Sequence, residues 1–78
     1  MANQKWLSEQ QTFVKGFLND FKDTGCVVDL LTQDNCNAAI YELYAIRKDS
    51  DYGSIMFRLT EHGTSWYYSI NFPSFWQR

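Results

Sequence analysis

Large apolar residues alternate with smaller or more polar ones near the C-terminus of this 78-residue chain. The four that share this spacing are Trp66, Tyr68, Ile70 and Phe72. Successive side chains of a β-strand point to opposite faces, so a spacing of two places all four on one face. Pro73 follows them, and proline lacks the N–H group that a sheet ladder needs. The pattern therefore predicts a strand over residues 65–72 with one face buried in a core.

An amphipathic helix is predicted over residues 8–22. Ser8 fits its N-cap, and Gln11 lies three residues later, as in a capping box. The apolar residues that recur along one side of this segment are Phe13, Val14, Phe17, Leu18 and Phe21. Such a stripe is what a helix buries against a sheet or another helix. Gly25 suits a stop just beyond the helix, and Gly16 inside it is expected to permit close approach to a sheet.

Two apolar segments follow the helix, and the second is ambiguous. Residues 26–32 are rich in strand formers, and residues 33–37 have the composition of a turn. Residues 38–48 fit a helix if Asn37 caps it, and they also fit a strand with apolar groups on both faces. Their aromatic and β-branched content favours the strand.

The remaining strands are predicted to follow one another through short turns. Residues 49–53 have a turn composition, and Ile55, Phe57 and Leu59 then alternate with other residues. Residues 61–64 close a hairpin in which Gly63 can take a positive φ. Strands joined by short loops pair antiparallel. The sequence thus predicts one α+β domain over residues 1–78, with the N-terminal helix packed on one face of a three- to four-stranded antiparallel meander sheet.

Composition limits the compartments and partners that suit the chain. Domains this small are marginally stable, but fourteen aromatic residues can supply a rich core. Nine acids and seven bases give a net charge of −2. Residues 1–12 lack the apolar segment of a signal peptide, and no stretch approaches the ~20 apolar residues that span a bilayer. We therefore expect a cytoplasmic protein without membrane contact, in which Cys26 and Cys36 are reduced.

No group of residues has the spacing of a catalytic or metal site. His62, the single histidine, falls in a predicted turn without a neighbour to orient it. Asp49 and Asp51 could begin a calcium loop, but the positions after them depart from the EF-hand pattern. Asp29 and Glu42 lie among apolar residues, and the neighbours of Glu42 could desolvate its carboxylate. We therefore expect no enzyme activity, no cofactor and no metal.

An aromatic sheet face can stack bases, so single-stranded nucleic-acid binding is an alternative function. The residues that it would use are Tyr41 and Tyr67, near Arg58, Arg47 and Lys48. The adjacent bases Arg47 and Lys48 are followed at once by acids. Because phosphate neutralisation supplies most non-specific affinity, a nucleic-acid partner is disfavoured.

The residues after Pro73 give the clearest indication of a binding surface. Phe75 and Trp76 lie beyond the predicted strand, where they either fold back over an open end of the core or stay on the surface as anchors. Aromatic and arginine side chains dominate interface hot spots. The candidate partner-binding residues are Tyr52, Arg58, Tyr67, Phe75 and Trp76.

These features favour protein binding as the function. The chain would be a non-enzymatic inhibitor or adaptor, of the kind carried by phages and mobile elements, that occludes part of a protein partner. A second copy of the chain could also use the anchors. A further alternative is a small dimer that binds a ligand in a pocket holding Glu42 or His62.

Overall fold

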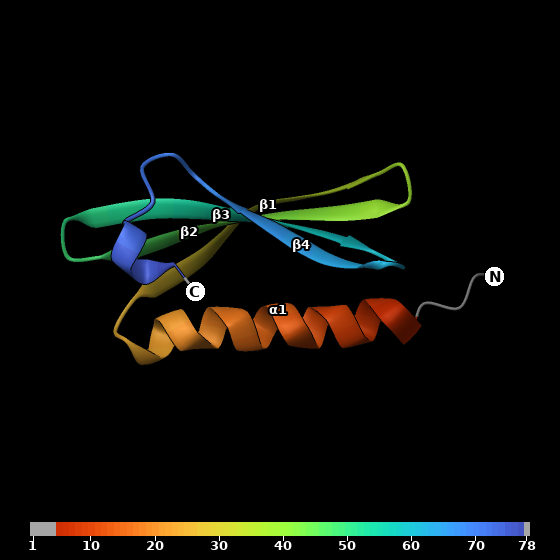
Figure 1. Ribbon diagram of the computed structural model, residues 1–78, viewed down its shortest axis with the longest axis horizontal. Helices are drawn as coiled ribbons and strands as arrows, with labels where there is room; N and C mark the ends of the chain where they lie inside the picture. Colours follow the sequence, from red (N-terminus) through yellow and green to blue (C-terminus); the bar gives the residue numbers. More distant parts are fainter. Residues whose placement is uncertain (1–4, 78) are drawn as a thin grey trace.

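One helix lies across one face of a four-stranded antiparallel sheet in the computed structural model of the chain, which describes residues 5–77 (Figure 1). The elements in chain order are α1 (Lys5–Asp23), β1 (Val27–Cys36), β2 (Ala39–Lys48), β3 (Asp51–Thr60), β4 (Gly63–Tyr68) and the 3-10 helix η1 (Ser74–Trp76). The strands are neighbours in the order β1-β2-β3-β4. The predicted α+β meander is confirmed, and the ambiguous segment 38–48 contains a strand. No helix within residues 5–77 has the length and apolarity to cross a bilayer.

The helix begins earlier than predicted and ends one residue later, at Asp23. Ser8 is inside α1, where its carbonyl accepts a hydrogen bond from the Thr12 hydroxyl at 3.0 Å, so the proposed cap at Ser8 is wrong. The sequence before the predicted cap already carries core residues, because Trp6 and Leu7 pack against the buried cluster. At the other end Gly25 has a φ of 92°.

The backbone around Gly25 forms a Schellman motif. The Cys26 N–H donates to the Phe21 carbonyl at 3.1 Å, and the Gly25 N–H donates to the Lys22 carbonyl at 3.0 Å. Cys26 and Phe21 also share the buried core, as the motif's accompanying apolar contact requires. These bonds satisfy helix carbonyls that would otherwise lack partners.

The core lies between α1 and the sheet face that points toward it. The helix buries Val14, Phe17, Leu18 and Phe21. The sheet buries Ile46, Ile55, Phe57 and Leu59 completely. Phe13 lies at the margin of the predicted stripe and is partly exposed, although its ring contacts Trp66 at 5.7 Å between centroids. Gly16 faces open space, so the expected close approach at that residue is wrong.

The β1–β2 turn lies later in the chain than predicted. Strand β1 continues through the polar residues 33–36, whose backbone pairs with β2. The turn consists of Asn37 and Ala38, with φ values of 52° and 61°. Two successive residues with positive φ form a type I′ turn, whose twist matches that of the flanking strands. Backbone pairing therefore outweighed the turn composition of residues 33–37.

The predicted C-terminal strand ends four residues early. Trp66 and Tyr68 face the helix as expected, but β4 stops at Tyr68 and Ile70 is fully exposed, so the assignment of Ile70 to the core is wrong. The chain turns after Ser69, whose N–H donates to the Ser54 carbonyl at 2.8 Å and whose hydroxyl accepts from the Ser54 N–H at 3.0 Å. This turn returns Phe72 to the core, where it is 5% exposed.

Gly53 of β3 makes room for Phe72. A Cβ atom at Gly53 would lie 2.5 Å from Phe72 Cδ2 and 3.0 Å from Phe72 Cα. The second contact involves backbone, so rotating the ring would not relieve it. The notch at Gly53 therefore fixes where the C-terminal segment meets the sheet.

Substituting Gly53→Ala is expected to lower the free energy of unfolding by about 1–3 kcal/mol, because the added methyl overpacks the contact with Phe72. Urea unfolding followed by tryptophan fluorescence measures the change. Gly16→Ala is the matched control. It adds the same methyl on the exposed side of α1, where no atom outside the local helix backbone lies within 4 Å, and should raise stability by up to about 1 kcal/mol. Equal effects of the two substitutions would contradict the proposed role of the notch.

Candidate protein-binding surface

The C-terminal segment presents two aromatic rings that differ in their support. Trp76 is half-buried and packs against the core, with its ring 5.8 Å from that of Phe72 at an interplanar angle of 77°. Phe75 is 75% exposed, and its ring lies 5.7 Å from Trp76 at 76°. The Trp76 N–H donates to the Pro73 carbonyl at 3.0 Å, which holds η1 together. Trp76 thus folds back over the core, whereas Phe75 stays on the surface.

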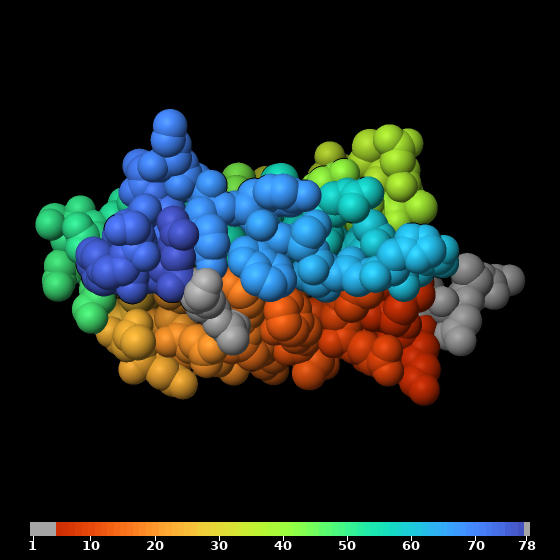
Figure 2. All heavy atoms as spheres, in the orientation of Figure 1, coloured from red at the N-terminus to blue at the C-terminus, as the bar shows by residue number. Residues whose placement is uncertain are grey.

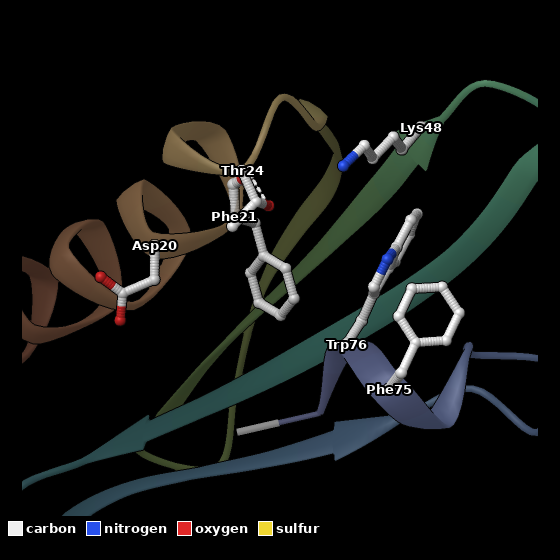
Figure 3. Close-up of a pocket in the computed structure, with 6 residues that line it drawn as sticks. All are labelled: Asp20, Phe21, Thr24, Lys48, Phe75 and Trp76. Carbon is white, nitrogen blue, oxygen red and sulfur yellow. Dashed lines mark hydrogen bonds between the residues drawn. The ribbon is translucent and has the colours of Figure 1, made fainter.

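A shallow hollow of about 340 Å³ lies between these rings and the C-terminal part of α1 (Figure 3). Its lining consists of Asp20, Phe21, Thr24, Lys48, Phe75 and Trp76. In Figure 3 the two rings project from η1 side by side, while the Asp20 carboxylate points away from them. Figure 2 shows the C-terminal segment in blue against the last turns of α1. The surface therefore combines an exposed ring with charged residues at its margin.

The other predicted partner-binding residues lie on the opposite face of the sheet. In the strand register Tyr41 is opposite Arg58, and Met56 is opposite Tyr67. Tyr67 is 52% exposed, and Tyr52 is also exposed. The Arg58 Nε–H donates to the Tyr41 hydroxyl at 3.2 Å. The five predicted residues therefore form two separate groups: Phe75 and Trp76 on the helix side, and Tyr52, Arg58 and Tyr67 on the uncovered face.

The uncovered face has a mixed electrostatic character. Arg58 is its positive charge beside the tyrosines, and Arg47 pairs with Asp29 at 2.9 Å near the end of the same face. The ion pair brings a carboxylate next to one of the two arginines. This arrangement differs from the continuous positive surface that phosphate binding requires.

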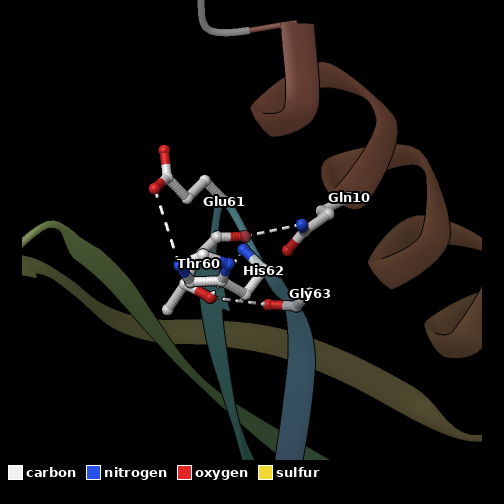
Figure 4. Close-up of polar contacts among 5 residues, drawn as sticks. All are labelled: Gln10, Thr60, Glu61, His62 and Gly63. Atoms are coloured by element: carbon white, nitrogen blue, oxygen red, sulfur yellow. Dashed lines mark hydrogen bonds and ion pairs between the residues drawn. The ribbon is translucent and has the colours of Figure 1, made fainter.

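His62 lies at the β3–β4 turn, as the sequence predicted, and is exposed (Figure 4). Its Nε2 is 3.5 Å from the Glu61 carboxylate, and 87% of its side chain is accessible. The turn is tied to α1 instead by Gln10, whose side-chain N–H donates to the Thr60 carbonyl at 2.6 Å and whose side-chain oxygen accepts from the Thr64 hydroxyl at 2.7 Å. These contacts give the turn a structural role in joining the helix to the sheet.

The two acids singled out from the sequence have different environments. Asp29 is exposed and paired with Arg47, whereas Glu42 is 7% exposed on the helix-facing side of β2. The Tyr44 hydroxyl donates to Glu42 Oε1 at 2.9 Å, and the Gln33 side-chain N–H donates to Oε2 at 3.3 Å. Burial raises the pKa of the Tyr44 phenol, and the hydrogen bond to Glu42 and the charge of that carboxylate raise it further.

The two cysteines are free and lie at opposite ends of β1. Cys26 is buried in the core, and Cys36 is exposed at the start of the β1–β2 turn. At about 3.3 Å per strand residue they are about 30 Å apart, far too distant for a disulfide.

Sequence reasoning missed Asp20 and Lys48 as neighbours of the aromatic pair. Asp20 lies on the predicted helix, Lys48 at the end of β2 and the two rings in η1, so the three parts of the surface come from distant parts of the chain. Only the return of the chain at Ser69 brings them together with η1. No local pattern in the sequence encodes that contact.

Substituting Glu42→Gln is expected to lower the pKa of Tyr44, because it removes the carboxylate charge and weakens the hydrogen bond. The pKa should stay above the ordinary value of about 10, since burial is the larger cause. In the wild type the folded-state pKa exceeds the unfolded one, so this phenol stabilises the fold fully below pH ~10 and the stabilisation is lost as pH rises above it.

Carbon-13 NMR of the tyrosine Cζ atoms through an alkaline titration measures this pKa, and urea unfolding at two alkaline pH values measures the linked stability. Tyr44→Phe is the control, because it removes the titrating group and should flatten the alkaline fall in stability. An unchanged Tyr44 pKa in Glu42→Gln would contradict the coupling.

Comparison of the chain with protein-family models, with characterised proteins and with solved structures gave no match. No relative therefore supplies a function for any of the surfaces described above. A functional proposal rests on the packing, exposure and charge of this chain's own residues.

Proposed function

We propose that this protein is a non-enzymatic module that binds another protein through Phe75, supported by Trp76. The observation that carries the proposal is the 75% exposure of a phenylalanine ring directly beside an anchored tryptophan. Removing so large a ring from water on binding is worth about 1.5–3 kcal/mol. Phe75 is the side chain that a partner's apolar pocket would take.

The support beneath Phe75 reduces the entropic cost of binding. Trp76 is held by Phe72, and Phe72 is held in the notch at Gly53. A ring presented on a fixed base loses less freedom on association than one on a loose terminus. This arrangement resembles the preorganised aromatic anchors that dominate interface hot spots.

The proposed mechanism is steric occlusion. Phe75 enters a pocket on the partner, and the end of the domain around Asp20 and Lys48 covers the surface next to it. The net charge of −2 favours approach to a basic surface. Two separated free thiols suit a reducing compartment, so we assign the protein to the cytoplasm.

Phe75→Ala is expected to weaken partner capture while leaving the fold intact. The exposed ring contributes little to the core, so the free energy of unfolding should change by less than about 0.5 kcal/mol. Affinity for the partner should fall at least tenfold, which corresponds to about 1.4 kcal/mol. Affinity purification from the organism that encodes the chain, with quantitative mass spectrometry, followed by titration of the captured protein, measures the loss.

Ile70→Ala is the matched control, because Ile70 is also an exposed apolar residue close in sequence but outside η1. It should retain every partner that the wild type captures. Size-exclusion chromatography of the wild type comes first, since a homodimer that dissociates in Phe75→Ala would identify a second copy as the partner. Retention of all partners by a folded Phe75→Ala protein would overturn the proposal.

A further inference from the structure

A second hollow lies between α1 and the β1–β2 side of the sheet, away from η1. It has a volume of about 340 Å³, at the small end of the ~300–1,000 Å³ typical of small-molecule sites. Its lining consists of Gln11, Val14, Lys15, Leu18 and Lys22 of α1, Val28 of β1, and Glu42 and Tyr44 of β2. The inference drawn from it is independent of the protein-binding function proposed for Phe75.

The buried carboxylate of Glu42 belongs to this hollow. Two neutral donors, Tyr44 and Gln33, bind one oxygen each. A carboxylate offers about four lone-pair sites, so each oxygen can accept a further bond. Within residues 5–77 Glu42 forms no ion pair. Burying a carboxylate without a counter-charge is costly, and a cationic group in the hollow would offset that cost.

The lysines give the hollow a second charged feature. Lys15 and Lys22 line it from α1, and both residues are exposed, so they bring positive charge to its solvent side. Apolar side chains from α1 and β1 complete the lining: Val14, Leu18 and Val28. A simple cation would meet two positive charges on entry, and a simple anion would meet Glu42.

We propose that this hollow binds a free α-amino acid with an apolar side chain. The ammonium group of the ligand bonds to Glu42, and its carboxylate pairs with Lys15 or Lys22. The apolar side chain packs against the partly exposed Val28, beside the buried Val14 and Leu18. A zwitterion carries both an ammonium group for Glu42 and a carboxylate for the lysines. An amine or a carboxylate alone would pair with only one of these charges.

Three probes of the same shape test this assignment by ¹H–¹⁵N correlation NMR of the full chain. They are L-leucine, 3-methylbutylamine, which lacks the carboxylate, and 4-methylpentanoate, which lacks the ammonium group. Leucine should shift the amide signals of Val14, Leu18, Val28 and Tyr44 and reach saturation. Each analogue should bind at least tenfold more weakly.

Two variants identify the groups responsible. Glu42→Gln keeps the side-chain shape and should abolish leucine binding, whereas Asp29→Asn removes an exposed carboxylate from neighbouring β1 and should leave it unchanged. If Glu42→Gln fails to fold, the double substitution Lys15→Met and Lys22→Met, on the exposed side of the site, should reduce leucine binding to the level of the amine.

Several results would overturn the proposal. These are the absence of a saturable shift with leucine, shifts confined to residues outside the hollow, and binding of either analogue as tight as that of leucine. Unchanged leucine binding in a folded Glu42→Gln protein would do the same.

Discussion

The contact of Phe17 with the sheet determines how the rest of the molecule is arranged. Its ring centroid lies 5.2 Å from that of Phe57, in an edge-on contact, and 5.0 Å from that of Trp66. Phe57 is on the inner strand β3, and Trp66 is on the outer strand β4. A helix with side chains is about 10 Å across, whereas four strands place the outer strand axes about 14 Å apart. One helix of this width therefore cannot cover the whole face. The hollow beside η1 and the hollow beside Glu42 both lie at the margin of the helix.

The regions of the sheet face beside β3 and beside β2 differ in how they are covered. Beside β3 the C-terminal segment closes the core with Phe72 and Trp76, both of which are large rings in edge-on contact. Beside β2 no described segment does so, and the side chain at that position is Glu42. An apolar residue at position 42 would extend the core. Packing alone does not explain a hydrogen-bonded carboxylate at this position, because replacing a buried charge with an apolar residue is often neutral or stabilising.

Local patterns in the sequence predicted the elements that depend on residue periodicity or on nearby residues alone. The stripe through Val14, Phe17 and Phe21 and the stop at Gly25 are set by helix geometry and need no knowledge of the rest of the fold. The errors occur where long-range pairing decides. Residues 33–36 extend β1 because β2 supplies backbone partners for them, and Ile70 leaves the sheet because Ser69 bonds to Ser54.

The binding surface could be predicted only in part, because it also depends on long-range contacts. The sequence identified Phe75 and Trp76 as rings that follow the last predicted strand. For both residues it left open whether the ring folds back over the core or stays on the surface. In the structure Phe72, held in the notch at Gly53, contacts the ring of Trp76 and not that of Phe75. Trp76 thus packs against the core, and the geometry of η1 then directs its neighbour outward. The exposure of Phe75 therefore follows from the packing of Trp76, and the contact between the two rings links the exposed one to the core.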